Sequence, residues 1–185
     1  ILAAAFFSVG ILDTFHAFTY QGMPLFLIES TYMTSTWLWI LARLTESSIL
    51  AVVFFMQELF KRIDRNLAFL VATIYPVVLI GIVFSFYKEL PVLIIDGAPT
   101  LTKNILEIFT ALLHLLVIVH LLRKPNKFND ILIRNVYIIG AFSIILSSLF
   151  FVQYKAIDAY LNSAGHLFKI IGYSMFFIVL FIVSI

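Results

Sequence analysis

The chain has 185 residues, of which 63% are hydrophobic and only 12% are charged. A water-soluble domain is about 25% charged, so this composition excludes a soluble globular protein and places most of the chain in a membrane. Twelve Lys and Arg against ten Asp and Glu give a formal net charge of +2, which leaves no basic groove for nucleic acid. Because cysteine is absent, disulfides, thiol nucleophiles and zinc–thiolate sites are excluded.

Six apolar windows predict an all-α integral membrane protein, a bundle of six transmembrane helices. A helix needs roughly 20 apolar residues to cross the hydrocarbon core. Runs such as 170–185 are apolar on every face, unlike the alternating strands of a β-barrel. The predicted helices, in chain order, are 1–20, 36–60, 67–87, 104–122, 132–153 and 163–185.

The loops predict the orientation of these helices. The connections after the second and fourth predicted helices carry the larger share of basic residues. These residues are Lys61, Arg62, Arg65, Arg123, Lys124, Lys127 and Arg134. The opposite loops hold only three basic residues, Lys88, Lys103 and Lys155, together with several acids. The positive-inside rule therefore predicts that both chain ends are cytoplasmic.

The two ends of the sequence indicate a segment of a longer polypeptide. Ile1 is not an initiator methionine, and the chain stops at Ile185 inside an apolar run. We therefore expect residues 1–185 to form one membrane domain that is truncated at both ends. The sequence has no G-x-S-x-G, phosphate-loop or HExxH motif, so we expect no enzyme activity in this segment.

Charged residues inside the predicted spans are the strongest indication of a functional site. There are five of them: Asp13, Arg43, Glu46, Glu107 and Lys169. A charged residue at the centre of a span costs about 2.5 to 3.5 kcal/mol, so five unpaired charges would cost on the order of 15 kcal/mol. These side chains must therefore pair with one another or face water.

Helical spacing groups these charges into one polar stripe on each of four helices. The stripes are Asp13, His16 and Tyr20; Trp39, Arg43 and Glu46; Lys103, Glu107, Thr110 and His114; and His166, Lys169 and Tyr173. With the predicted orientation, most of these residues lie toward the outer ends of their helices. The stripes together predict one polar layer that leans toward the outer face of the membrane.

The five charges sum to −1, which indicates that a proton or a cation is missing from the layer. His16 and His166 are placed to supply it by protonation, or to bind a metal ion together with Glu46 or Glu107. The same two histidines, on different helices, could also ligate a haem axially. The cofactor is therefore left open between none, a metal ion and haem.

A structural interpretation of the same residues also stands. The charges could be buried ion pairs that only fix the register of the helices. The pairs would be Arg43 with Glu46, Asp13 with His16, and Glu107 with Lys169.

Four sequence blocks resemble the third type of bacterial membrane-associated sensor domain, of the MASE group. They are LDTFHAFTYQGMP (12–24), TWLWILARLTESS (36–48), LTKNILE (101–107) and AGHLFKIIGY (164–173). The resemblance implies a multi-pass domain of the bacterial inner membrane, placed before a cytoplasmic histidine kinase or diguanylate cyclase, often with PAS domains between. By analogy with those enzymes we expect a homodimer.

The resemblance and the charge pattern predict the same functional residues. We expect a non-catalytic sensing module whose polar pocket binds a small ligand, a proton or a metal ion and passes its state through the last helix to the fused output domain. The predicted pocket residues are Asp13, His16, Tyr20, Trp39, Arg43, Glu46, Lys103, Glu107, His166 and Lys169. The alternatives are a transporter or channel fragment and a haem- or quinone-binding membrane protein.

Overall fold

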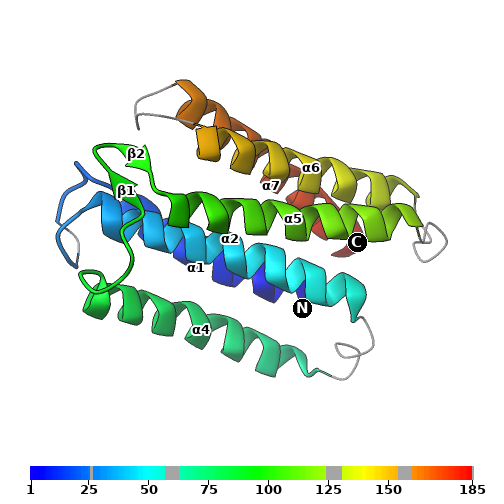
Figure 1. The fold of residues 1–185 in the computed structure, drawn as a ribbon. Coiled ribbons are helices and arrows are strands. Elements are labelled where there is room, and N and C mark those ends of the chain that lie inside the picture. The colour runs from blue at the N-terminus through cyan, green and yellow to red at the C-terminus, as the bar shows by residue number, and fades with distance from the viewer. Residues whose placement is uncertain (26, 57–62, 124–130, 154–159, 185) are drawn as a thin grey trace.

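The structure, a computed structural model, describes the chain apart from residues 26, 57–62, 124–130, 154–159 and 185. The described residues form six helices and one two-stranded antiparallel hairpin. The helices are α1 (Leu2–Phe18), α2 (Tyr32–Phe55), α4 (Arg65–Phe86), α5 (Leu101–Arg123), α6 (Ile131–Gln153) and α7 (Tyr160–Ser184), and the strands are β1 (Ile94–Ile95) and β2 (Ala98–Pro99). The predicted helical bundle is confirmed, with one helix for each predicted span (Figure 1).

The lengths and surfaces of the helices suit a bilayer. Among the described residues, α2, α4, α5, α6 and α7 are each long and apolar enough to cross a membrane. α1 has 17 residues, about 25 Å of helix, which is close to the lower limit for a span. α4 exposes large apolar side chains along its length, among them Val71, Ile74 and Val78. Such a surface is stable against hydrocarbon, so the chain is a multi-pass membrane protein in contact with lipid.

Capping residues set the helix boundaries. α2 begins at Tyr32, several residues before the predicted start, because the Thr31 hydroxyl accepts a hydrogen bond from the Thr34 amide at 3.1 Å. Asp64 caps α4 in the same way, accepting from two backbone amides at 2.9 and 3.0 Å. α2 ends at Phe55, and most of the remainder of the predicted second span lies outside the described residues.

α2 occupies the centre of the bundle. It packs against α1, α4 and α5, while α6 packs against α5 and α7 packs against α6. Figure 1 shows the hairpin of β1 and β2 at one end of the bundle and the N-terminus of α1 toward the other. The side chains that α2 buries include several polar and charged ones, so its packing faces carry polar chemistry as well as apolar contacts.

The orientation of the bundle in the membrane stays a prediction. Three of the basic residues on which the predicted orientation depends are described by the structure. Arg65 lies in the first turn of α4, Arg123 in the last turn of α5 and Arg134 in the first turn of α6. The other basic residues used for the orientation lie outside the described residues: Lys61, Arg62, Lys124 and Lys127.

α6 and α7 approach each other through glycines. A Cβ atom on Gly172 would lie 2.7 Å from Ile144 Cδ1 and 3.1 Å from the carbonyl oxygen of Gly140. A Cβ atom on Gly140 would lie 2.8 Å from the ring of Phe176. Small residues at a contact between membrane helices allow the backbones to come close, which increases van der Waals contact. α6 and α7 therefore form a tightly packed pair.

The hairpin closes one end of the bundle, and the sequence analysis did not anticipate it. Its turn places Asp96 and Gly97 at positive φ angles of 50° and 77°, which short-side-chain Asp and Gly tolerate. Leu93, just before β1, is fully buried against Trp39 and Phe151. The hairpin thus covers the part of α2 that carries the predicted polar stripe.

Candidate functional site

Four of the charged side chains of the predicted pocket lie in the interior of the bundle, while Asp13 and Lys169 are partly buried. Arg43, Glu46 and Lys103 are each 2% exposed, and Glu107 is fully buried. Removal of a charge from water costs several kcal/mol, which only close partners of opposite charge can offset. The pairing of these side chains therefore determines whether this part of the bundle is stable.

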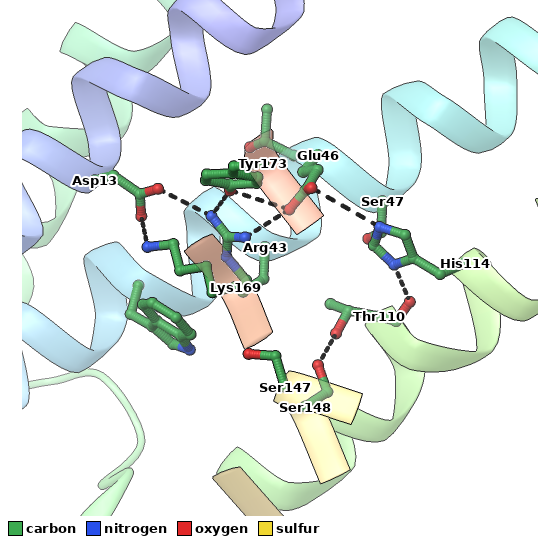
Figure 2. Close-up of polar contacts among 12 residues, drawn as sticks. Asp13, Arg43, Glu46, Ser47, Thr110, His114, Ser147, Ser148, Lys169 and Tyr173 are labelled. Atoms are coloured by element: carbon green, nitrogen blue, oxygen red, sulfur yellow. Dashed lines mark hydrogen bonds and ion pairs between the residues drawn. The ribbon is translucent and has the colours of Figure 1, made fainter. Parts of the chain in front are cut away.

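Arg43 is the centre of the first cluster, which joins three helices. Its Nη2 atom lies 3.0 Å from Asp13 Oδ2 on α1, and its Nη1 atom lies 2.6 Å from Glu46 Oε2, one turn further along α2. From α7, Lys169 Nζ lies 3.1 Å from Asp13 Oδ1. Tyr173 Oη, also on α7, accepts from Arg43 and donates to Glu46 Oε2 at 3.2 Å (Figure 2). The two helices at the start of the chain are thus bound to the last one.

Aromatic rings enclose the cations of this cluster. The Arg43 guanidinium lies 4.9 Å from the centroid of the Trp39 ring and 4.8 Å from that of Tyr173. Lys169 Nζ lies 4.2 Å from the Trp39 centroid. Ring faces attract cations, and the attraction is strongest where water is excluded. The rings therefore replace part of the hydration that Arg43 and Lys169 lose in the bundle.

A second cluster forms around Glu107 on α5. Its Oε1 atom accepts from Trp39 Nε1 at 2.8 Å and lies 3.4 Å from Lys103 Nζ. Lys103 also donates to the carbonyl oxygen of Phe151 on α6 at 3.2 Å. Trp39 touches both clusters, because its ring faces the cations of the first and its N–H group binds the carboxylate of the second. One side chain of α2 thus connects the two clusters.

Lys103 corrects the predicted charge balance. The count of −1 left it out because it was grouped with the loop residues, but it lies in the first turn of α5 and is buried beside Glu107. The three cations and three carboxylates of the two clusters sum to zero. The pairs that form also differ from those predicted: Asp13 binds Arg43 and Lys169, and Glu107 binds Lys103.

His16 and His166 both lie against the Trp39 ring. Their ring centroids are 5.3 and 5.4 Å from that of Trp39. His16 Nδ1 lies 2.7 Å from the carbonyl oxygen of Ser35, which can only accept, so this nitrogen carries a hydrogen. The two histidines line a cavity of about 40 Å³ together with Tyr20 and Lys103. This volume holds one or a few water-sized groups.

The predicted metal and haem sites do not assemble in the described part of the chain. There, no group of three or more His, Asp or Glu side chains is arranged to hold a metal ion. Of the predicted ligands, His16 and His166 line the small cavity, whereas Glu46 and Glu107 are held by Arg43 and by Lys103. The cavity is also far smaller than the roughly 300 Å³ or more that a drug-sized ligand occupies, so haem does not fit it.

Two residues of the site were absent from the predicted pocket. Tyr173 bridges Arg43 and Glu46, and His114 Nε2 lies 3.9 Å from Glu46 Oε1 (Figure 2). Both lie on the predicted polar stripes, His114 two turns beyond Glu107 and Tyr173 one turn beyond Lys169. The spacing of polar residues was therefore sufficient to find His114 and Tyr173. They were left out because the pocket residues were chosen by their match to the family.

Fold and site together define a multi-pass helical membrane domain in which buried charges connect helices distant in sequence. A sequence model of the MASE3 family, described as a membrane-associated sensor domain, matches residues 1–185, and the chain belongs to this family. The predicted resemblance is thereby confirmed, and the domain is a sensor domain rather than a catalytic one. No curated protein and no solved structure matches the chain.

Proposed function

We propose that this sensor domain detects a small ligand or a proton at the site around Arg43 and Trp39, and that α7 carries the state of the site to a cytoplasmic output domain. The output domain would be a histidine kinase or a diguanylate cyclase in the bacterial inner membrane, acting as a homodimer. The observation that carries the proposal is that Lys169 and Tyr173 of α7 bind the charged groups of α1 and α2.

Packing supports this role for α7. Its backbone lies closest to α6, and the two helices interlock through glycines. Its polar links to α1 and α2 are made by side chains, namely Lys169 to Asp13 and Tyr173 to Arg43 and Glu46. A change of charge or occupancy at the site alters these links without disturbing the contact between α6 and α7. The pair can then shift as one unit against α1 and α2.

Two features of the site support detection of something small. The space beside Trp39 is about 40 Å³ and is lined by groups that can donate or accept hydrogen bonds, including His16, Lys103 and His166. The neighbouring charges are already paired, so a small added charge or dipole would change the balance of a water-poor region, where electrostatic interactions are strong. Large ligands have no room there.

The alternative of a transporter or channel is less well supported. Transport sites near the membrane midplane are typically built from discontinuous helices with glycine or proline interruptions. Among the described residues, α2, α4, α5, α6 and α7 each run without a break. α4 stays helical past Pro76, which is buried.

The proposal is tested in the full-length protein in its own membrane by Lys169→Met, which removes the ammonium group and keeps a flexible apolar chain. The matched control is Lys88→Met, because Lys88 is an exposed loop lysine. Output activity per molecule and abundance in the membrane are measured for both variants. We expect Lys169→Met to change output at least several-fold and Lys88→Met to leave it unchanged. Unchanged output of Lys169→Met at normal abundance would overturn the proposal.

A further inference from the structure

Three polar atoms in the centre of the bundle are buried and have no hydrogen-bond partner. They are Glu46 Oε1 on α2, His114 Nε2 on α5 and Tyr137 Oη on α6. Glu46 Oε1 and His114 Nε2 lie 3.9 Å apart and face each other (Figure 2). Tyr137 is close enough to Glu46 to interact with it electrostatically. Buried polar atoms nearly always have partners, so a group that satisfies these atoms is expected here.

The hydrogen-bond chemistry of His114 identifies what is missing. Its Nδ1 atom lies 2.9 Å from the carbonyl oxygen of Thr110. A carbonyl oxygen only accepts, so Nδ1 carries a hydrogen, and in the neutral ring Nε2 therefore presents a lone pair. An ionised Glu46 presents lone pairs as well. Two acceptors thus face each other, and the arrangement is stable only if a hydrogen is supplied between them.

The other oxygen of Glu46 connects this position to α7. Glu46 Oε2 accepts from Arg43 Nη1 at 2.6 Å and from Tyr173 Oη at 3.2 Å. One carboxylate therefore faces His114 with one oxygen and the network of Arg43 and Tyr173 with the other. A change of the Glu46 charge alters its interactions with His114 and also with Arg43 and Tyr173, because the charge of a carboxylate is shared between its two oxygens.

We infer that Glu46 and His114 form a proton-binding site in the centre of the bundle. A proton taken up from water forms an N–H bond at His114 Nε2 or an O–H bond at Glu46 Oε1, and no bond within the protein breaks. The remaining acceptor receives the new hydrogen bond. The inference rests on the proposed function. It identifies the ligand as a proton and places that proton between Glu46 and His114.

The charged groups around Glu46 and His114 determine what protonation of this pair does to the bundle. From the helices packed around it these are Asp13 of α1, Arg43 of α2, and Lys169 and Tyr173 of α7, with Tyr137 of α6 as a further titratable group. With Glu46 ionised, the four formal charges of the first cluster sum to zero. Uptake of a proton raises the sum to +1, weakens the hold of Glu46 on Arg43 and Tyr173, and favours separation of α7 from α2.

The test compares three variants of the full-length protein in lipid vesicles. His114→Gln removes the imidazole and places an amide N–H group that can donate to Glu46 Oε1, so this oxygen no longer needs an added proton. Glu46→Gln places an amide nitrogen that donates to His114 Nε2, so it satisfies the pair permanently. His120→Gln is the matched control, since His120 lies six positions further along α5 and contacts Phe55 instead, with ring centroids 4.6 Å apart. Output activity is recorded as a function of pH, and infrared difference spectra between acid and alkaline pH record protonation directly.

We expect the wild type and His120→Gln to show the same pH dependence of output and the same infrared change. His114→Gln and Glu46→Gln should lose both. An infrared change and a pH profile that survive in His114→Gln would overturn the inference and leave a bridging water molecule as the missing donor. A wild type whose output does not respond to pH would overturn it equally.

The two proposals fail in different ways. If Lys169→Met alters output while His114→Gln keeps the wild-type pH profile, the proton site is wrong and the sensing role of the larger site stands. If Lys169→Met also leaves output unchanged at normal abundance, both are wrong. The abundance of Glu46→Gln in the membrane checks folding, because its amide keeps the buried acceptor of His114 satisfied.

Discussion

The two sides of α2 differ sharply in packing and chemistry. Toward α5, α7 and Asp13 of α1 the helix carries the paired charges, and the cavity on that side measures about 40 Å³. Toward α1 and α4 it borders a crevice of about 650 Å³, lined mostly by apolar side chains. Three of the hydroxyls that line the crevice are already bonded: Ser8 donates to the carbonyl of Ala72 at 2.7 Å, and Thr45 donates to the carbonyl of Leu41 at 2.7 Å and lies 3.0 Å from the Tyr75 hydroxyl.

The large crevice and the buried charges therefore lie on different sides of α2. In a membrane an apolar crevice is open to lipid tails, which are as apolar as the side chains that line it, so its size does not indicate a specific site. Buried charges are costly unless they have partners, so their presence in a membrane domain needs an explanation. An apolar crevice needs none. The small, charged side of α2 is therefore the better candidate for sensing. Substitutions on the two sides should differ accordingly.

The largest effect is expected from Arg43→Met. Arg43 is bound to Asp13, Glu46 and Tyr173, and its loss removes the cation that lies 3.0 Å from one buried carboxylate and 2.6 Å from the other. Removal of one partner from a buried ion pair costs about 3 to 5 kcal/mol. We expect low abundance in the membrane and a much lower thermal unfolding temperature.

The control is Arg123→Met, because Arg123 is an exposed arginine at the end of α5. It should change the thermal unfolding temperature little. If Arg43→Met were as stable as Arg123→Met, the charged cluster would not hold α1, α2 and α7 together, and the contrast between the two sides of α2 would lose its basis.

A smaller effect is expected at the contact of α6 and α7. Gly172→Ala brings a methyl group to 2.7 Å from Ile144 Cδ1 and to 3.1 Å from a backbone oxygen of α6, so the Ile144 side chain must move and the two backbones must separate by a few tenths of an ångström. Overpacking of this kind costs about 1 to 3 kcal/mol. Gly81→Ala on α4 is the control, because a Cβ atom there meets nothing within 4 Å.

In Gly81→Ala the higher helix propensity of alanine should dominate, with no loss of stability. The two variants are compared by thermal unfolding in detergent or lipid. Equal stability of Gly172→Ala and Gly81→Ala would show that α6 and α7 are not in close contact, and that they do not move as one pair.

The sequence predicted the helices because hydropathy and span length are strong constraints in a bilayer. It also predicted which faces are polar, since His114 and Tyr173 lie on the stripes that contain Glu107 and Lys169. The helix starts were missed because caps such as Thr31 and Asp64 are single polar residues that hydropathy does not register. The segment around Leu93 looked like a loop, since its two strands have only two residues each.

The partners of the charges could not be predicted from spacing. Spacing places Asp13 and Arg43 on faces of their own helices, but which faces meet depends on how the helices pack. Lys103 was taken for a loop lysine because it follows a polar connection, whereas its side chain is buried beside Glu107 and Phe151. The balance of buried charge therefore became visible only in the structure.

The smallest effect is expected in the apolar crevice. Ala68→Leu on α4 adds a larger apolar side chain to a space lined by apolar groups, so stability should change by no more than about 0.5 kcal/mol and output should stay the same. The matched substitution on the other side of α2 is Thr110→Leu, because Thr110 is fully buried between Glu107 and His114. There the added bulk should displace α5 from α6 and reduce both abundance and output. Output per molecule is measured for both. If Ala68→Leu altered output as strongly as Thr110→Leu, the crevice would take part in sensing. The sensing site would then not be confined to the charged side of α2.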